Sequence, residues 1–82
     1  MAAADASTEV SAAETDAAAP ALLWDRANTA YINGDYRAAA ETYEELLAQG
    51  LVSVKLCYNL ANAYFKADRL GKAILFYRRA LR

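Results

Sequence analysis

Two sets of side chains with hydrogen-bonding chemistry stand 34 residues apart in this chain. In each set an asparagine lies between two aromatic residues at spacings i, i+4 and i+7, which places all three on one face of a helix. The two sets are Trp24, Asn28, Tyr31 and Tyr58, Asn62, Phe65. Because an asparagine amide offers both donors and acceptors, this chemistry suits the backbone of a peptide.

The sequence lacks the usual equipment of an enzyme. It has no histidine, which removes the commonest general base and metal ligand. Cys57 is the only cysteine, and its place in a helical pattern predicts a small buried hydrophobe. Glu41 and Glu45 lie one turn apart, where solvation explains them better than acid–base chemistry. With no phosphate-binding loop or metal-ligand spacing, we expect neither catalysis nor a cofactor.

A repeat organises the chain. When residues 20–48 are placed on residues 54–82, six positions are identical. They are Leu22/Leu56, Ala27/Ala61, Asn28/Asn62, Ala39/Ala73, Tyr43/Tyr77 and Leu47/Leu81. A fixed period in this range predicts stacked helical units, which present extended binding surfaces.

Apolar periodicity predicts an all-α fold of four helices, near residues 21–33, 36–48, 52–66 and 70–82. Pro20 suits a first turn, Gly34 and Gly50 suit helix ends, and Asp35 suits an N-cap. Asp68 stands where the first unit has Gly34, which predicts a softer turn. Alanines recur at matching places in the two units, namely Ala27, Ala39, Ala61 and Ala73. We expect these alanines to lie in the core together with Tyr43 and Tyr77.

Charge is segregated along the chain. Residues 1–19 carry four acids and no cation, residues 20–53 five acids and two cations, and residues 54–82 one acid and seven cations. The first segment is rich in alanine with almost no large apolar side chain, which predicts a disordered acidic tail or else a frayed helical extension. The basic second unit favours an acidic ligand or head-to-tail contacts between molecules. No signal peptide or membrane span is recognisable, and the compartment stays open.

The chain resembles the tetratricopeptide repeat (TPR) family in residues 58–66 and 71–81, and again in Gly34–Asp35–Tyr36 followed by Ala39 and Tyr43. The resemblance implies two repeats, 20–53 and 54–82, forming a short right-handed superhelical array that binds protein. It departs from the family at Leu51, where Pro is frequent, and at Asp68, where Gly is usual. The second unit is similar to TPR proteins of bacterial aerotolerance (Bat) operons.

The resemblance also implies a peptide-binding groove lined by the first helix of each repeat. Carried over by position, its residues are Trp24, Asn28, Tyr31, Lys55, Tyr58, Asn59, Asn62, Phe65 and Lys66, flanked by Asp25 and Ile32. The two lysines would attract acidic groups of a protein or peptide partner. A TPR subgroup grips C-terminal carboxylates with asparagines placed like Asn28 and Asn59, but it has a lysine at the place of Trp24. The alternative for Asn28 and Asn62 is structural, with each amide bonded between neighbouring helices.

Two further expectations concern the second unit. The pattern stops inside its last helix, so we expect a fragment of a larger bacterial protein whose surface at Leu75, Phe76 and Leu81 associates with missing repeats or, in a homodimer, with a second copy. Nucleic-acid binding is the less favoured alternative, because the acidic tail would oppose phosphate contact. It would use the cations Arg69, Lys72, Arg78, Arg79 and Arg82.

Overall fold

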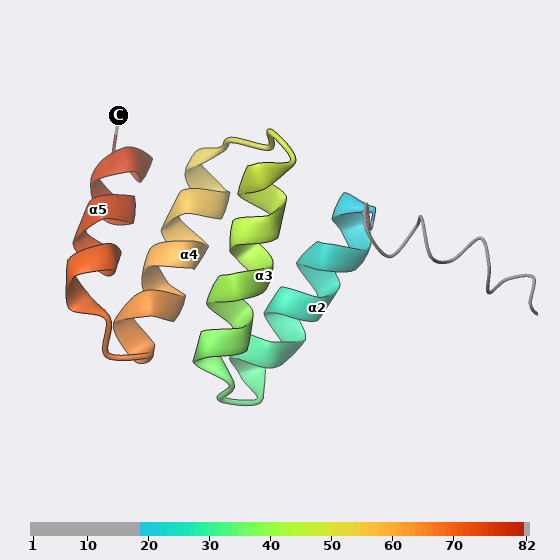
Figure 1. The fold of residues 1–82 in the computed structure, drawn as a ribbon, viewed down its shortest axis with the longest axis horizontal. Helices are drawn as coiled ribbons and strands as arrows, with labels where there is room; N and C mark the ends of the chain where they lie inside the picture. Colours follow the sequence, from blue (N-terminus) through green and yellow to red (C-terminus); the bar gives the residue numbers. More distant parts are fainter. Residues whose placement is uncertain (1–18, 82) are drawn as a thin grey trace, which may run out of the picture.

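The computed structural model describes residues 19–81, which form four α-helices and no strand. The helices are α2 (Pro20–Ile32), α3 (Tyr36–Ala48), α4 (Val54–Lys66) and α5 (Leu70–Ala80). They lie side by side in chain order, each packed on the next (Figure 1). The predicted all-α repeat fold is confirmed. The predicted tail lies outside the described residues except for Ala19, as does Arg82.

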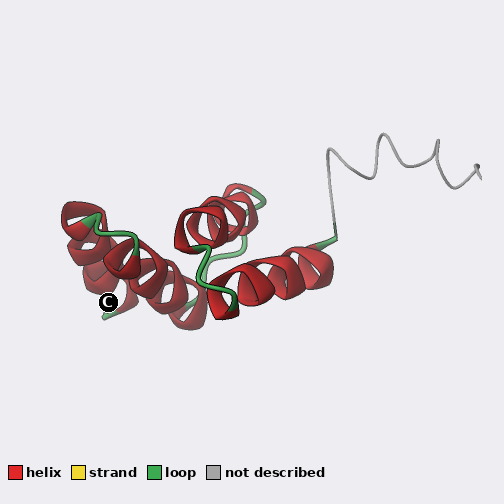
Figure 2. Ribbon diagram, turned by 90° about the horizontal axis from the view of Figure 1, so that it is seen from below, coloured by secondary structure: helices red, strands yellow, loops and turns green. Residues whose placement is uncertain are grey.

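Short loops join the helices, and the view from below shows that the helices do not lie in one flat layer (Figure 2). The hairpins α2–α3 and α4–α5 fall within the predicted units 20–53 and 54–82. Helix α3 packs on both α2 and α4, so it joins the two hairpins. In the part of the chain that the structure describes, no helix is both long and apolar enough to cross a bilayer.

All three connections use the same helix-ending turn. At the first, the N–H of Gly34 donates to the carbonyl of Tyr31 at 3.0 Å, and the N–H of Asp35 donates to Ala30 at 2.8 Å. This pair of bonds defines the Schellman motif, which needs a left-handed residue at its centre. The three central residues are Gly34 at φ +84°, Gly50 at +90° and Asp68 at +67°. Asp68 has a side chain and is held at positive φ, which is unfavourable for residues other than glycine. This is the physical reason to expect a weaker turn at Asp68.

Helix α3 begins at Tyr36 as predicted, but its expected side-chain cap is absent, and the start of α4 differs from the prediction. Asp35 occupies the N-cap of α3, but its side chain makes no capping hydrogen bond, because its backbone at ψ 71° belongs to the preceding turn. Helix α4 begins at Val54 rather than near residue 52. There the Oγ of Ser53 accepts a hydrogen bond from the N–H of Leu56 at 3.0 Å, which fixes the first turn.

The core lies where the alanines let helices approach closely. Ala27, Ala39, Ala61 and Ala73 are each at most 1 % exposed, which confirms the sequence prediction for them. Leucines fill the space between these crossings, and the fully buried ones are Leu23, Leu46, Leu56 and Leu60. Cys57 is buried, as predicted. Tight packing at the alanines brings the side chains of neighbouring helices within hydrogen-bonding distance of one another.

The two equivalent turns provide a matched test of backbone strain. Gly34→Ala should lower the free energy of unfolding by about 1 kcal/mol, because alanine resists positive φ. No atom lies within 4 Å of the position that its Cβ would take, so the cost comes from φ alone. Asp68→Gly should raise the free energy of unfolding by about 0.5 kcal/mol. Urea unfolding followed by circular dichroism measures both, and two changes of the same sign would contradict the assignment of strain to positive φ.

Candidate functional site

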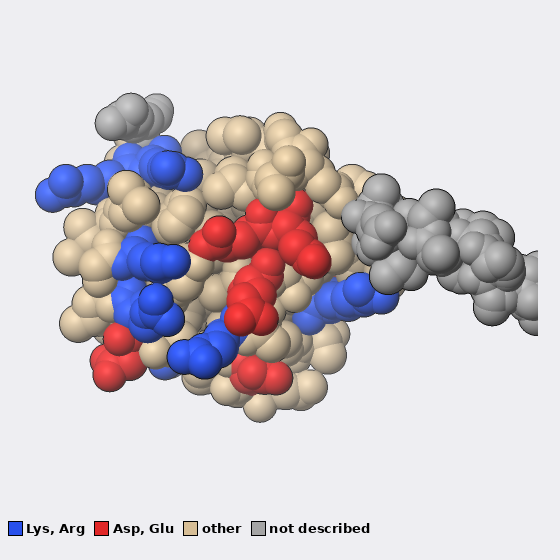
Figure 3. All heavy atoms as spheres, in the orientation of Figure 1, with Lys and Arg blue, Asp and Glu red and all other residues tan. Residues whose placement is uncertain are grey.

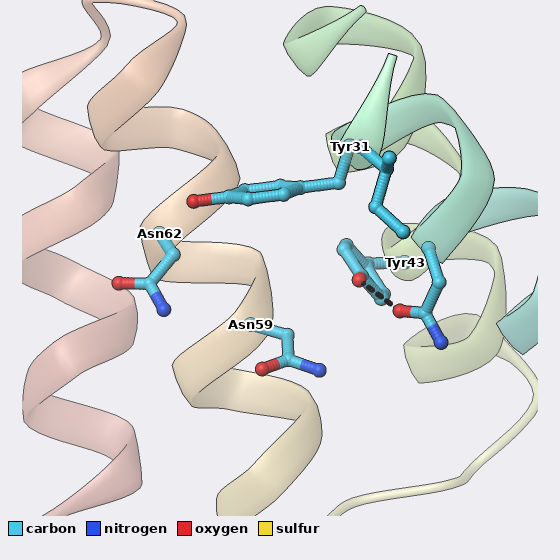
Figure 4. A pocket seen from close by; sticks show the side chains of 6 residues that line it. Tyr31, Tyr43, Asn59 and Asn62 are labelled. Atoms are coloured by element: carbon cyan, nitrogen blue, oxygen red, sulfur yellow. Dashed lines mark hydrogen bonds between the residues drawn. The ribbon is translucent and has the colours of Figure 1, made fainter. Parts of the chain in front are cut away.

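A hollow of about 320 Å³ opens between α2, α3 and α4, and we call it the groove. Its lining comes from these three helices and consists of Asn28, Tyr31, Ile32, Tyr43, Asn59 and Asn62. Figure 4 shows Tyr31 extending toward the helix that carries Asn62, while Asn59 and Asn62 project from one side of that helix. Of the lining residues, only Tyr43 had been assigned to the core alone from the sequence. The sequence did contain a signal that Tyr43 could line the groove. Tyr43 recurs at a period-matched core position, and an asparagine lies on the helix that faces it.

Each hairpin contains the same hydrogen bond between its two helices. The hydroxyl of Tyr43 donates to Oδ1 of Asn28 at 2.6 Å, and the hydroxyl of Tyr77 donates to Oδ1 of Asn62 at 2.5 Å. The first of these bonds is the dashed line in Figure 4. Asn28 and Asn62 therefore each make a hydrogen bond between neighbouring helices, as the structural alternative predicted, and the partner is a tyrosine hydroxyl.

This bond also decides what the asparagines present to the groove. With Oδ1 accepting from tyrosine, the amide oxygen is engaged inside the hairpin and the Nδ2 group is left to donate. Asn28 is exposed and Asn62 half-buried, so both amides are accessible from the groove. The two amides are therefore suited to partners that accept hydrogen bonds.

The tyrosine hydroxyls stay protonated and so remain donors. Burial raises the pKa of Tyr43 above its ordinary value, and the nearby Tyr31 raises it further, while a hydrogen-bonding contact with Asn59 lowers it. Burial likewise raises the pKa of Tyr77, with Tyr58 and Tyr31 acting in the same direction. The hydroxyl–amide bonds consequently persist across the neutral pH range.

Aromatic rings and a lysine pack outside the lining of the groove, and one of them contacts the lining residue Tyr43. The Trp24 ring meets the Tyr43 ring edge to face, with centroids 5.6 Å apart. The Lys55 Nζ lies 5.8 Å from the centre of the Trp24 ring, a cation–π contact between α4 and α2. Tyr58 packs edge to face on Tyr77 at 5.7 Å, which is the second-hairpin counterpart of the Trp24–Tyr43 pair.

Five of the nine predicted groove residues do not line the hollow, and these are Trp24, Lys55, Tyr58, Phe65 and Lys66. Phe65 is 55 % exposed, and neither it nor Lys66 lines the groove. The Lys66 Nζ instead sits 5.9 Å from the centre of the Tyr36 ring, which in turn packs against Tyr31 at 5.1 Å. These residues follow Asn62 by a turn of α4, so they extend the same side of the molecule without joining the hollow.

The expected self-association surface is corrected by the burial of Phe76. This side chain is only 6 % exposed and stacks on Tyr64, so the prediction that it lies on the open surface is wrong. Leu75 and Leu81 are exposed as expected. Leu70 and Ile74 are also exposed on α5, although the predicted surface did not include them. The repeat could have identified Leu70 and Ile74. They are the period-matched counterparts of Tyr36 and Ala40 in α3.

Another face of the molecule separates acids from bases. Figure 3 shows acidic side chains gathered over α3 and basic ones over α5. On this face the Tyr64 hydroxyl of α4 donates to the Glu44 carboxylate of α3. Burial raises the pKa of Tyr64, and the hydrogen bond to Glu44 and its negative charge raise it further. Among residues 19–81, no group of three or more histidine, cysteine, aspartate or glutamate side chains is placed to hold a metal ion.

Comparison with protein families identifies the repeat. A family model described as Tetratricopeptide repeat matches residues 24–82, well over half of the chain. Comparisons with curated proteins and with solved structures each found no significant match. The matched stretch contains most of α2 and all of α3, α4 and α5, so the family match and the helical fold describe the same residues.

The Tyr64–Glu44 contact predicts a stability that depends on alkaline pH. Because the pKa of Tyr64 is raised in the folded chain, its contribution is fully present below the ordinary tyrosine value near 10 and is lost as the pH rises through the folded value. Tyr64→Phe should lower the free energy of unfolding at pH 7 by about 1 kcal/mol and make its fall above pH 10 shallower. Urea unfolding from pH 7 to 11 measures this, with Tyr36→Phe as control. An unchanged alkaline slope in Tyr64→Phe would refute the assignment.

Proposed function

The chain belongs to the tetratricopeptide repeat family, whose repeats generally mediate contacts between proteins, and we propose that its groove binds an extended segment of a partner protein. The segment would present hydrogen-bond acceptors, namely backbone carbonyls and acidic side chains. One observation carries the proposal: Tyr43 and Tyr77 hold the Asn28 and Asn62 amides with their oxygens engaged and their N–H groups left to donate.

Charge and ring surface support the same ligand chemistry. Lys55 lies over the Trp24 ring, which contacts the lining residue Tyr43, and it adds attraction for a carboxylate. Tyr31 and Ile32 supply apolar area in the lining, which a peptide side chain can cover. The combination of a few placed polar groups with aromatic area is typical of ligand-binding surfaces. The predicted roles of Tyr58, Phe65 and Lys66 fit a longer segment that continues along α4.

A C-terminal carboxylate clamp is not part of this proposal, because Trp24 replaces the lysine that the clamp subgroup requires. The resemblance of the second unit to TPR proteins of Bat operons stays a prediction, since the family match is to the repeat in general. Self-association through α5 is the alternative function, and exposed apolar residues on that helix favour some contact there.

The groove can be tested with variants that remove the donors and keep the oxygen that accepts from tyrosine. Asn28→Asp and Asn62→Asp keep an oxygen that accepts from tyrosine but replace the N–H groups with a charged acceptor. Against peptides selected from a random twelve-residue library on the unmodified chain, each variant should bind at least about tenfold more weakly in fluorescence anisotropy. Thr29→Ala, on an exposed position of α2 outside the groove, should bind like the unmodified chain.

The result that contradicts the proposal is equally specific. If no peptide is enriched, or if the selected peptides bind both aspartate variants as tightly as the parent chain, the groove is not a donor surface. Circular dichroism of each variant establishes that the helices are retained, so that weaker binding reports on the groove.

A further inference from the structure

A second hollow, of about 480 Å³, lies between α3, the end of α4 and the start of α5, and we call it the charged hollow. Its polar lining consists of Arg37, Glu41, Glu44, Tyr64, Arg69 and Lys72. No residue lines both this hollow and the groove, so the two are separate surfaces. The volume falls in the range of about 300–1,000 Å³ that is typical of small-molecule sites.

The acids and most of the cations of the charged hollow come from different helices. Glu41 and Glu44 lie on α3, whereas Arg69 lies in the turn before α5 and Lys72 in the first turn of α5. Arg37, in the first turn of α3, adds a third cation. Figure 3 shows the same separation, with acidic side chains over α3 and basic ones toward α5. A ligand in the hollow therefore meets charges of both signs.

Tyr64 of α4 contacts one charge of each sign. Its hydroxyl donates to the Glu44 carboxylate, and the Lys72 Nζ lies 5.3 Å from the centre of its ring, a cation–π contact. Burial raises the pKa of Tyr64, and the carboxylates of Glu44 and Glu41 raise it further. The Arg69 guanidinium lowers this pKa, so acids and a cation both act on the one hydroxyl.

The repeat does not account for the cations of the charged hollow. The residues 34 positions before Arg69 and Lys72 are Asp35 and Ala38. The first hairpin thus folds with an acid and a methyl group where the second has two cations, so neither cation is needed to build a hairpin. The hydrogen bond from tyrosine to asparagine, by contrast, is present in both hairpins. The charged hollow is therefore a feature of how these two hairpins are combined.

The mixture of charges discriminates between classes of ligand. An anion alone is attracted by the cations but repelled by two carboxylates, and a cation alone meets the opposite conflict. A neutral ligand removes water from both sets of charges without replacing its hydrogen bonds, which is costly. A ligand with an ammonium group at one end and a carboxylate at the other complements both sets.

We propose that the charged hollow binds a zwitterion of amino-acid or dipeptide size. The ammonium group of the ligand donates to the carboxylates of Glu41 and Glu44, and its carboxylate accepts from Arg69 and Lys72. Such charge-assisted hydrogen bonds are roughly twice as strong as neutral ones. Arg37 adds attraction for the carboxylate of the ligand.

The test compares zwitterions with ligands that carry only one of the two charges. Straight-chain ω-amino acids, from glycine to 6-aminohexanoate, are titrated into the full chain while the ring signals of Tyr64 are followed by nuclear magnetic resonance. The tightest binder is then compared with the alkylamine and the alkanoate of the same carbon number. We expect it to bind at least about tenfold more tightly than either, because each of them lacks one set of ionic contacts.

Paired variants assign the two ends of the ligand. With Glu41→Gln and Glu44→Gln together, the zwitterion should bind no more tightly than the alkanoate binds the same variant. With Arg69→Gln and Lys72→Gln together, it should bind no more tightly than the alkylamine does. The matched control is Glu45→Gln, an exposed neighbour of Glu44 outside the lining, which should leave the affinity unchanged. Circular dichroism of each variant establishes that the helices are retained.

Several results would overturn the inference. These are no saturable shift with any ω-amino acid, equal affinity for the zwitterion and one of its single-charge counterparts, or a loss of affinity in Glu45→Gln as large as in the paired variants. Asn62→Asp in the groove should leave the affinity for the zwitterion unchanged. Failure of this proposal and failure of the peptide-binding groove are therefore distinguishable.

Discussion

The hydrogen bond from a tyrosine hydroxyl to an asparagine amide, made once in each hairpin, is the interaction on which the rest of this structure depends. It joins Tyr43 to Asn28 and Tyr77 to Asn62, so it ties the second helix of each hairpin to the first. The close approach of helices at Ala27 and Ala39 places these side chains within reach of one another. Because the bond engages the amide oxygen, the same contact that stabilises the hairpin leaves N–H donors for a ligand.

The period that repeats this bond also explains the contrast between α3 and α5. Both helices carry the same apolar pattern, but α3 has a neighbour on each side, whereas α5 packs only on α4 among the described residues. Ala40 is buried and Ile74 exposed for that reason. The change from Glu44 to Arg78 at the equivalent place gives the uncovered side a different electrostatic preference. The groove and the uncovered side of α5 are thus two consequences of one repeated hairpin.

Much of this fold was predictable because its determinants are local and periodic. The helices, the alanine crossings and the turns at Gly34 and Gly50 follow from spacing and from residues that favour particular backbone angles. Errors arose where the tertiary context decided the outcome. Phe76 is buried because it stacks on Tyr64, a contact between helices that no single-helix pattern reveals. Asp35 does not cap with its side chain because its backbone belongs to the Schellman turn. The asparagine positions were predictable, but the orientation of their amides required the partner tyrosines.

Nuclear magnetic resonance relaxation of the asparagine side-chain amides tests the central claim, that tyrosine hydroxyls hold the groove amides in one orientation. In the unmodified chain, Nδ2 of Asn28 and Asn62 should be nearly as ordered as the backbone, with order parameters near 0.85, about the value of a rigid backbone. Tyr43→Phe should lower the value for Asn28 below about 0.6 and leave Asn62 unchanged, while Tyr77→Phe should do the reverse. If Asn28 stays equally ordered without the Tyr43 hydroxyl, the amide is held by something else and the central claim is contradicted.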